Sequence, residues 1–221
     1  MKTASPTPTP SETSQYLGAA GHCFLPEGKK ATQGSGADFD PKDVRVRACV
    51  SGCSFGGLTG QVIRGTFVNL GPVAYARAAG IGEDFGIVQI PPALASRVRP
   101  SVPVWGGPSA VSNDVSGVVC YFGRGIVFGE VFPTMGRVGY GLGTSNDGSF
   151  DAAGPLGSGD SGAALETCTP GGDAQAAGII THGAGMTEPA VTALLFGTTV
   201  NKAIAMAARD ANLALSVVLA S

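Results

Sequence analysis

Charged residues are scarce in this 221-residue chain, at 14% of the sequence, and the net charge is only -2 at pH 7. The chain has no basic patch of the kind that binds nucleic acid, and it has no acidic tail. No apolar run approaches the roughly 20 residues that a membrane-spanning helix needs. We therefore expect neither a nucleic acid nor a membrane among the partners.

The first residues also lack the apolar core of a secretory signal peptide, because they read MKTASPTPTPSETS. The alternation of Pro, Thr and Ser predicts an extended, disordered segment over residues 1–15.

The five cysteines lack the repeated C-x-x-C spacing of a zinc site, and we expect neither a metal nor a cofactor. Disulfide bonds formed in an oxidising compartment explain the cysteines better. An odd number leaves at least one thiol free or bonded to a partner outside this sequence.

Glycine is abundant, with 35 residues, and it accompanies 15 prolines and short runs of Val, Ile and Phe. This composition predicts a mainly β protein, and the length suffices for two small barrels that share an interface. We expect strands at 16–20, 44–50, 61–64, 66–70, 85–90, 117–122, 125–132, 137–140, 163–166, 176–181 and 193–199. We also expect a short helical turn at 74–79, a proline-rich crossover at 91–108, a polar loop at 141–159 and a helix within 200–215.

One serine stands among glycines in the stretch GSGDSGAAL, residues 157–165. A serine hydroxyl needs a base and an oxyanion site before it can act as a nucleophile. The glycines permit a tight turn, which can aim the N–H groups of Gly159 and Ser161 at the oxygen of a reacting carbonyl. A simple polar loop between two strands explains the same residues, so this stretch alone does not settle its role.

Two further stretches supply a base and an acid. YLGAAGHC, residues 16–23, places His22 after a short apolar strand, and EDFGIVQI, residues 83–90, places Asp84 at the start of another. Histidine suits the role of base because its ordinary pKa is about 6.5. The other candidate acids are Glu83, beside Asp84, and three residues of a polar loop that no buried strand follows: Asp38, Asp40 and Asp43.

In the order His, Asp, Ser, the three motifs resemble the chymotrypsin-like serine endopeptidases. The marks of that family are an Ala-Ala/Gly-His-Cys segment, an Asp that opens an aliphatic strand, and Gly-Asp-Ser-Gly. The resemblance covers about residues 16–210. It implies that Ser161 is the nucleophile, that His22 accepts and returns its proton, and that Asp84 holds the other ring nitrogen. Gly159 and Ser161 would form the oxyanion hole, and Asp160 would be structural.

The resemblance also implies an all-β fold of two six-stranded antiparallel barrels followed by a C-terminal helix. The first barrel would span 16–108 and the second 109–199, with the helix and tail at 200–221. Only about twenty residues precede His22, which leaves two alternatives open: the sequence is truncated before the first strands of the family pattern, or the first barrel has fewer strands.

A disulfide between Cys120 and Cys168 is a further implication of the resemblance, and it would close the loop that contains the approach to Ser161. In the family, the cysteine after the histidine pairs with an upstream cysteine, and no cysteine precedes Cys23 here. Cys23 therefore pairs with Cys49 or Cys53, or it stays free.

The resemblance places Pro155, six residues before Ser161, at the floor of the primary substrate pocket. Its wall would be the segment Ile180-Thr181-His182-Gly183, whose backbone would pair with an extended substrate. No acid stands at these positions, and a buried cation without a partner is costly, so we do not expect cleavage after Arg or Lys. We expect small or apolar side chains there. A protonated His182 that binds an acidic side chain is the alternative.

The sequence thus predicts a secreted, monomeric serine endopeptidase that acts on polypeptides. A catalytically silent relative that serves as a binding module is the alternative. An esterase of another fold is a third hypothesis, but the strand–helix alternation of α/β-hydrolases is absent.

Overall fold

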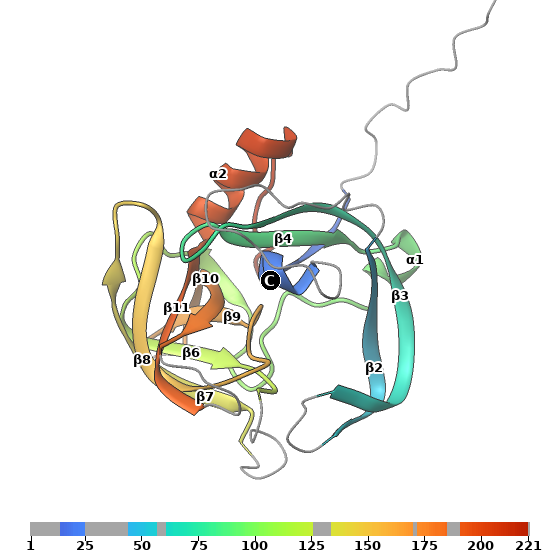
Figure 1. Ribbon diagram of the computed structural model, residues 1–221, viewed down its shortest axis with the longest axis horizontal. Coiled ribbons are helices and arrows are strands. Elements are labelled where there is room, and N and C mark those ends of the chain that lie inside the picture. Colours follow the sequence, from blue (N-terminus) through green and yellow to red (C-terminus); the bar gives the residue numbers. More distant parts are fainter. Residues whose placement is uncertain are drawn as a thin grey trace, which may run out of the picture.

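The computed structural model describes residues 14–24, 44–56, 61–125, 134–169, 172–184 and 191–220. Most of these residues are in strands, which form two sheets, and the C-terminal helix α2 (Val200–Ala211) packs where the sheets meet (Figure 1). The mainly β fold and the C-terminal helix are therefore confirmed.

The first sheet consists of β1 (Tyr16–Ala19), β4 (Asp84–Gln89), β3 (Gln61–Ala78) and β2 (Arg45–Gly56), in that order and antiparallel throughout. A one-turn 3-10 helix, η1 (Gly21–Phe24), follows β1. The long strands β2 and β3 continue as a two-stranded ribbon along one side of the molecule (Figure 1). Among the described strands no pairing joins β1 to β2, so this sheet does not close.

The second half forms a closed antiparallel barrel of six strands. These are β6 (Ser116–Phe122), β7 (Gly136–Thr144), β8 (Ser149–Gly157), β11 (Val191–Thr199), β10 (Ala174–Gly183) and β9 (Ala164–Cys168). Pairing of β10 with β11 closes the ring, and the short strand β5 (Pro108–Val111) adds to β10 in parallel. Inward side chains such as Tyr121, Phe150, Ile180 and Leu195 fill the barrel and are fully buried.

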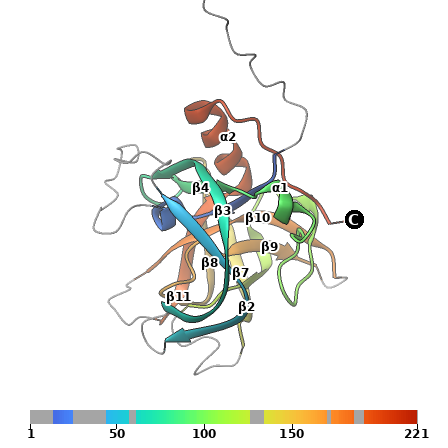
Figure 2. The ribbon, with the colours of Figure 1, turned by 90° about the vertical axis from the view of Figure 1, so that its right-hand side faces the viewer.

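A second core joins the two sheets. Tyr75, Phe85 and Ile87 of the first sheet pack with Ile179 of β10 and with Met206 of α2. The helix begins at Thr199, whose hydroxyl accepts the N–H of Lys202, and it ends at Asn212, whose left-handed φ of 53° stops the helical pattern. The tail then runs past α1 (Pro92–Ala95) to β5, where the Ala220 N–H donates to the Pro108 carbonyl (Figure 2). No helix in the described ranges is long and apolar enough to cross a membrane.

Three predicted local structures are wrong. Residues 74–79 do not form a helical turn, because pairing with β4 overrides the helical preference of their alanines. The expected break at Gly65 is absent, and β3 is continuous from Gln61 to Ala78. Most of the loop predicted at 141–159 is strand, because Phe150, Ala152 and Leu156 of β8 point into the barrel core.

Other predictions lie outside the described residues: the disordered segment up to residue 13, the strand beyond residue 125, and the acids Asp38, Asp40 and Asp43.

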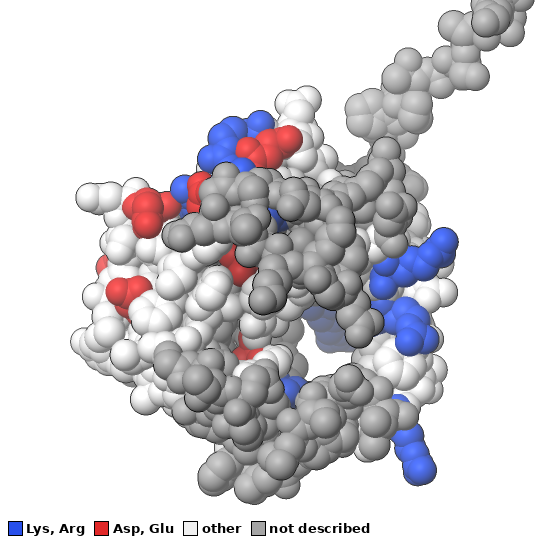
Figure 3. Space-filling view, viewed as in Figure 1, with Lys and Arg blue, Asp and Glu red and all other residues white. Residues whose placement is uncertain are grey.

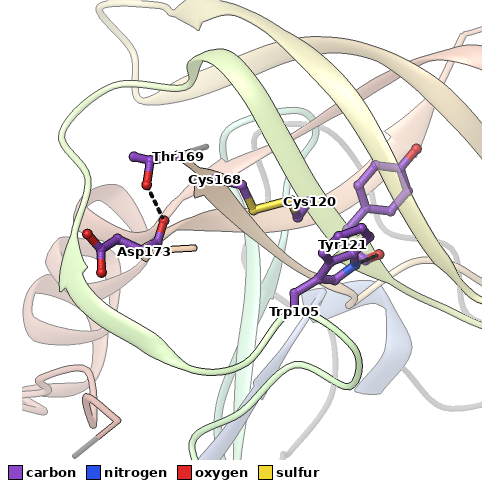
Figure 4. Close-up of a disulfide and its surroundings, with 6 residues drawn as sticks. All are labelled: Trp105, Cys120, Tyr121, Cys168, Thr169 and Asp173. Atoms are coloured by element: carbon purple, nitrogen blue, oxygen red, sulfur yellow. Dashed lines mark hydrogen bonds between the residues drawn. A yellow bond between two sulfur atoms is a disulfide. The ribbon is translucent and has the colours of Figure 1, made fainter. Parts of the chain in front are cut away.

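The disulfide between Cys120 and Cys168 is present and joins β6 to β9, as predicted (Figure 4). It lies beside Trp105, whose ring N–H donates to the Tyr121 carbonyl at 3.0 Å. A second disulfide joins Cys49 to Cys53 within β2, and Cys23 is a free, exposed thiol. The two bridges indicate an oxidising compartment.

The exposed charges are unevenly distributed. The strands β2 and β3 contain four arginines and no acid. Figure 3 shows basic side chains along the edge formed by this ribbon, whereas the acidic ones lie over the barrel and near α2.

Candidate active site

His22 and Asp84 meet because β1 and β4 are neighbours in the first sheet. His22 follows β1 in η1, and Asp84 opens β4. Nδ1 of the imidazole lies 2.6 Å from Oδ2 of Asp84, and the backbone N–H of His22 donates to Oδ1 at 3.0 Å. Asp84 is only 1% exposed. Bonds to both carboxylate oxygens fix the ring and the acid relative to each other.

Thr198, in the last strand of the barrel (β11), binds the backbone of Asp84. The N–H of Asp84 donates to the Thr198 hydroxyl oxygen at 3.3 Å, and that hydroxyl donates to the Asp84 carbonyl at 3.1 Å. Thr198 is fully buried. We did not identify Thr198 from the sequence, because nothing near residue 198 points to an acid 114 residues earlier.

Ser161 lies in the turn between β8 and β9. Gly159 and Gly162 have φ values of +96° and +90°, which favour glycine. The N–H of Gly162 donates to the Ile180 carbonyl at 2.8 Å, which ties the turn to β10. Among the described residues, the N–H groups of Gly159 and Ser161 have no acceptor. Both remain available to a ligand oxygen.

A buried ion pair between Arg137 and Asp160 supports this turn. Both terminal nitrogens of Arg137 bind the Asp160 carboxylate, each at 2.5 Å. The same carboxylate accepts the N–H groups of Gly125 and Gly157, at 2.7 and 2.8 Å. Asp160 is therefore structural, next to Ser161. Arg137 is 4% exposed, and its position in a strand of apolar and glycine residues was the only sequence signal for its role.

The Ser161 hydroxyl donates to the Thr181 carbonyl of β10 at 3.4 Å. Among the described residues it makes no hydrogen bond to His22. The serine nevertheless lies close to η1, because the Cys23 thiol donates to the Ser161 carbonyl at 3.6 Å. A Cβ on Gly162 would lie 3.1 Å from the Cβ of Ala19. Ser161, His22 and Asp84 thus come from three elements to the seam between the two sheets.

The environment of His22 changes its pKa. Burial lowers it, but the hydrogen bond with Asp84 and the charge of that carboxylate, together with a hydrogen bond to Cys23, outweigh burial and raise the pKa of His22 to about 10. His22 is therefore a cation at neutral pH in this arrangement.

The predicted pocket residues lie on β8 and β10. Pro155 is in β8 and is exposed, and its carbonyl accepts the Tyr121 hydroxyl at 2.7 Å. His182 and Gly183 pair with β11 on one side, whereas the pairing of β10 with β9 ends at Ile179. Ile180 still bonds on this edge to the turn that holds Ser161, through its N–H to the Ala163 carbonyl and through its carbonyl to the Gly162 N–H. Beyond Ile180 the second edge of β10 is unpaired among the described strands.

The remaining candidate acid does not reach the histidine. Glu83 binds Arg77 at 2.7 Å and lies 3.8 Å from the ammonium of Lys202. In the described part of the chain, no group of three or more His, Cys, Asp or Glu side chains could hold a metal ion.

The chain matches no protein-family model and no curated protein. The geometry of the site and the three motifs therefore provide the basis for assigning its chemistry.

Proposed function

We propose that this protein is a secreted serine endopeptidase of the chymotrypsin-like type, with Ser161, His22 and Asp84 as its catalytic residues. The observation that carries the proposal is that Ser161 lies beside Cys23, the residue after His22, at the seam where His22 bonds with Asp84. Sixty-two residues separate the bonded pair His22 and Asp84, and 138 separate Ser161 from Cys23, the neighbour of His22. The two disulfides support an oxidising, extracellular location.

In the proposed reaction, the Ser161 hydroxyl turns from the Thr181 carbonyl toward neutral His22. The ring takes the hydroxyl proton while the oxygen attacks the substrate carbonyl carbon, and Asp84 stabilises the imidazolium. The free N–H groups of Gly159 and Ser161 bind the oxyanion. His22 then gives the proton to the leaving amine, and an acyl-enzyme forms. Water, deprotonated by His22, releases the acid and regenerates Ser161.

The unpaired edge of β10 provides a place for an extended substrate, which would add as a strand beside Thr181–Gly183. His182 faces Asp84, with 4.0 Å between Nδ1 and Oδ2. An acidic substrate side chain bound to His182 would approach this buried negative charge. Small or apolar side chains before the scissile bond therefore fit the site better than acidic ones.

A catalytically silent binding protein is the second candidate. One observation favours it: the Ser161 hydroxyl donates to the Thr181 carbonyl rather than to His22. The raised pKa of His22 agrees with this candidate, because a protonated ring cannot accept the serine proton.

Labelling with a fluorophosphonate probe, followed by hydrolysis of a peptide library, separates the two candidates. An endopeptidase labels at Ser161, loses the label in Ser161→Ala, and cleaves peptide bonds. Ser161→Ala and His22→Ala should each remove nearly all activity, and the double variant should be little worse, because the residues act as one unit. Absence of labelling up to pH 10 in folded protein would support the silent module.

The same library tests the substrate side chain. Dominant cleavage after Arg, or after Glu with loss of that preference in His182→Ala, would contradict the expected apolar preference.

A further inference from the structure

Thr198 binds both polar groups of the Asp84 backbone with a single hydroxyl. Its oxygen accepts the Asp84 N–H at 3.3 Å, and its proton goes to the Asp84 carbonyl at 3.1 Å. Both residues are buried, with exposed fractions of 0% and 1%. A buried N–H or carbonyl without a partner is costly, so this hydroxyl satisfies two groups that the interior would otherwise leave unpaired.

The place of Asp84 in the first sheet explains why a side chain makes these bonds. The carbonyl of Glu83 accepts the Ala79 N–H at 2.9 Å and so faces the end of β3. The Asp84 N–H belongs to the same planar peptide group and points the opposite way, toward the side on which β1 lies. On that side the pairing of β4 with β1 ends at Gly86. The Thr198 hydroxyl thus takes the place of a strand partner.

Thr198 belongs to the other half of the molecule. It lies in β11, the strand that closes the barrel, whereas Asp84 opens β4 of the first sheet. The next residue, Thr199, caps α2 and bonds to the Gly148 carbonyl through both its N–H and its hydroxyl, each at 3.0 Å. The end of β11 is therefore fixed to the helix and to the barrel, and Asp84 is bonded to this fixed point.

We propose that Thr198 is a positioning residue: it fixes the Asp84 backbone across the seam, so that the carboxylate stays directed at His22. The proposal rests on the proposed hydrolysis, because only there does the His22–Asp84 pair have a task. His22 binds both carboxylate oxygens, at 3.0 Å from its N–H and 2.6 Å from Nδ1. Without the hydroxyl, the peptide groups beside Asp84 would turn toward other partners and move the carboxylate with them. Thr198 acts through Asp84 and touches no reacting atom.

Three substitutions separate the hydroxyl from its packing. Thr198→Val keeps the size of the side chain and removes the hydroxyl, whereas Thr198→Ser keeps the hydroxyl and removes a methyl group. Thr199→Val is the matched control, because it removes a buried hydroxyl from the same strand–helix junction. That hydroxyl bonds to Gly148 and Lys202 instead of Asp84.

NMR titration of His22 tests the proposal without requiring catalysis, since the chain has only two histidines. Burial lowers the pKa of His22, and the bond with Asp84 raises it. In a Ser161→Ala background, Thr198→Val should lower this pKa by about one pH unit or more, because a displaced carboxylate favours the imidazolium less. Thr198→Ser and Thr199→Val should both keep the pKa of the parent.

An unchanged His22 pKa in folded Thr198→Val protein would overturn the proposal. An equal fall in Thr199→Val would also overturn it, because the effect would then come from the junction as a whole. If Thr198→Val does not fold, Thr198→Cys supplies a weaker hydrogen-bonding group and should lower the pKa by part of that amount, so the parent value there would count equally against the proposal. None of these outcomes depends on peptide hydrolysis, so failure here is distinct from failure of the proposed function.

Kinetics provide the second readout. We expect Thr198→Val to lower kcat about tenfold or more, with KM within about twofold, because a misplaced catalytic group slows the reaction without weakening substrate binding. Thr198→Ser should restore most of kcat, and Thr199→Val should retain it. Equal losses of kcat in Thr198→Val and Thr198→Ser, or a change in KM alone, would show that Thr198 only packs at the seam.

Discussion

Glu166 presents a buried carboxyl group without a partner, and its removal should stabilise the protein at alkaline pH. The residue lies in β9, between Cys120 of β6 and Ala176 of β10, and is 2% exposed. Within the described residues, neither carboxyl oxygen has a hydrogen-bond partner. Burial alone raises the pKa of Glu166 from 4.5 to about 7, and no charged group contributes.

The size of the effect follows from this pKa. At 1.36 kcal/mol per pH unit, a rise from 4.5 to about 7 corresponds to about 3 kcal/mol. The folded protein holds the proton more tightly than the unfolded chain, so the free energy of unfolding falls as pH rises between these two values and then levels off. A loss of about 3 kcal/mol is a large part of the 5–15 kcal/mol typical of a folded domain.

Urea denaturation of the wild type and of Glu166→Gln at pH 4.5 and pH 8 measures this penalty. The glutamine has no charge to bury. From pH 4.5 to pH 8, the free energy of unfolding of the variant should therefore rise by about 3 kcal/mol relative to that of the wild type. Glu83→Gln is the matched control. The ion pair with Arg77 lowers the pKa of Glu83. The stabilisation that the Glu83 carboxylate contributes to the fold is therefore lost only as the pH falls below 4.5, the ordinary pKa of a glutamate. A constant difference between Glu166→Gln and the wild type would refute the reasoning.

Two further predictions concern the support of the site. Arg137→Met leaves the Asp160 carboxylate buried and unpaired, so it should lower the free energy of unfolding by about 3–5 kcal/mol in urea denaturation. Adding Asp160→Asn should recover part of the loss, and additive losses would contradict a coupled pair. The proposed hydrolysis requires neutral His22, whose pKa is raised to about 10, so kcat/KM should rise through the alkaline range. Cys23→Ala removes one cause of that rise and should move the midpoint to lower pH, whereas an unchanged midpoint would show that Cys23 has no such influence.

Local sequence patterns predicted the parts of the fold in which strand preference and burial agree. Residues 85–90 are an aliphatic run, and they form the buried strand β4. The strand β8 has the sequence SFDAAGPLG, in which Asp, Ala, Gly and Pro are poor strand formers, and its pairing with β7 and β11 outweighs them. Pro155 lies where the register with β11 shifts, a place in a sheet that tolerates proline.

The candidate site likewise has residues that the sequence indicated and residues that only the structure shows. Each of the motifs around His22, Asp84 and Ser161 is contiguous in sequence, so the three residues could be singled out, and the family resemblance implied that they lie together. Arg137 and Thr198 act through contacts across 23 and 114 residues, which no local pattern encodes. The direction of His182 depends on a one-residue irregularity between two strands, and only the pairing register reveals it.

The bonds between Asp84 and Thr198 also bear on when the candidate site can form as the chain is made. The ribosome produces the chain from its N-terminus, so His22 and Asp84 emerge more than a hundred residues before β11. Until β11 has left the ribosome, Asp84 lacks both of its bonds to the Thr198 hydroxyl, and β10 lacks the neighbour that closes the barrel. The candidate site therefore cannot take its full form before β11 has been made, although His22 and Asp84 are present much earlier.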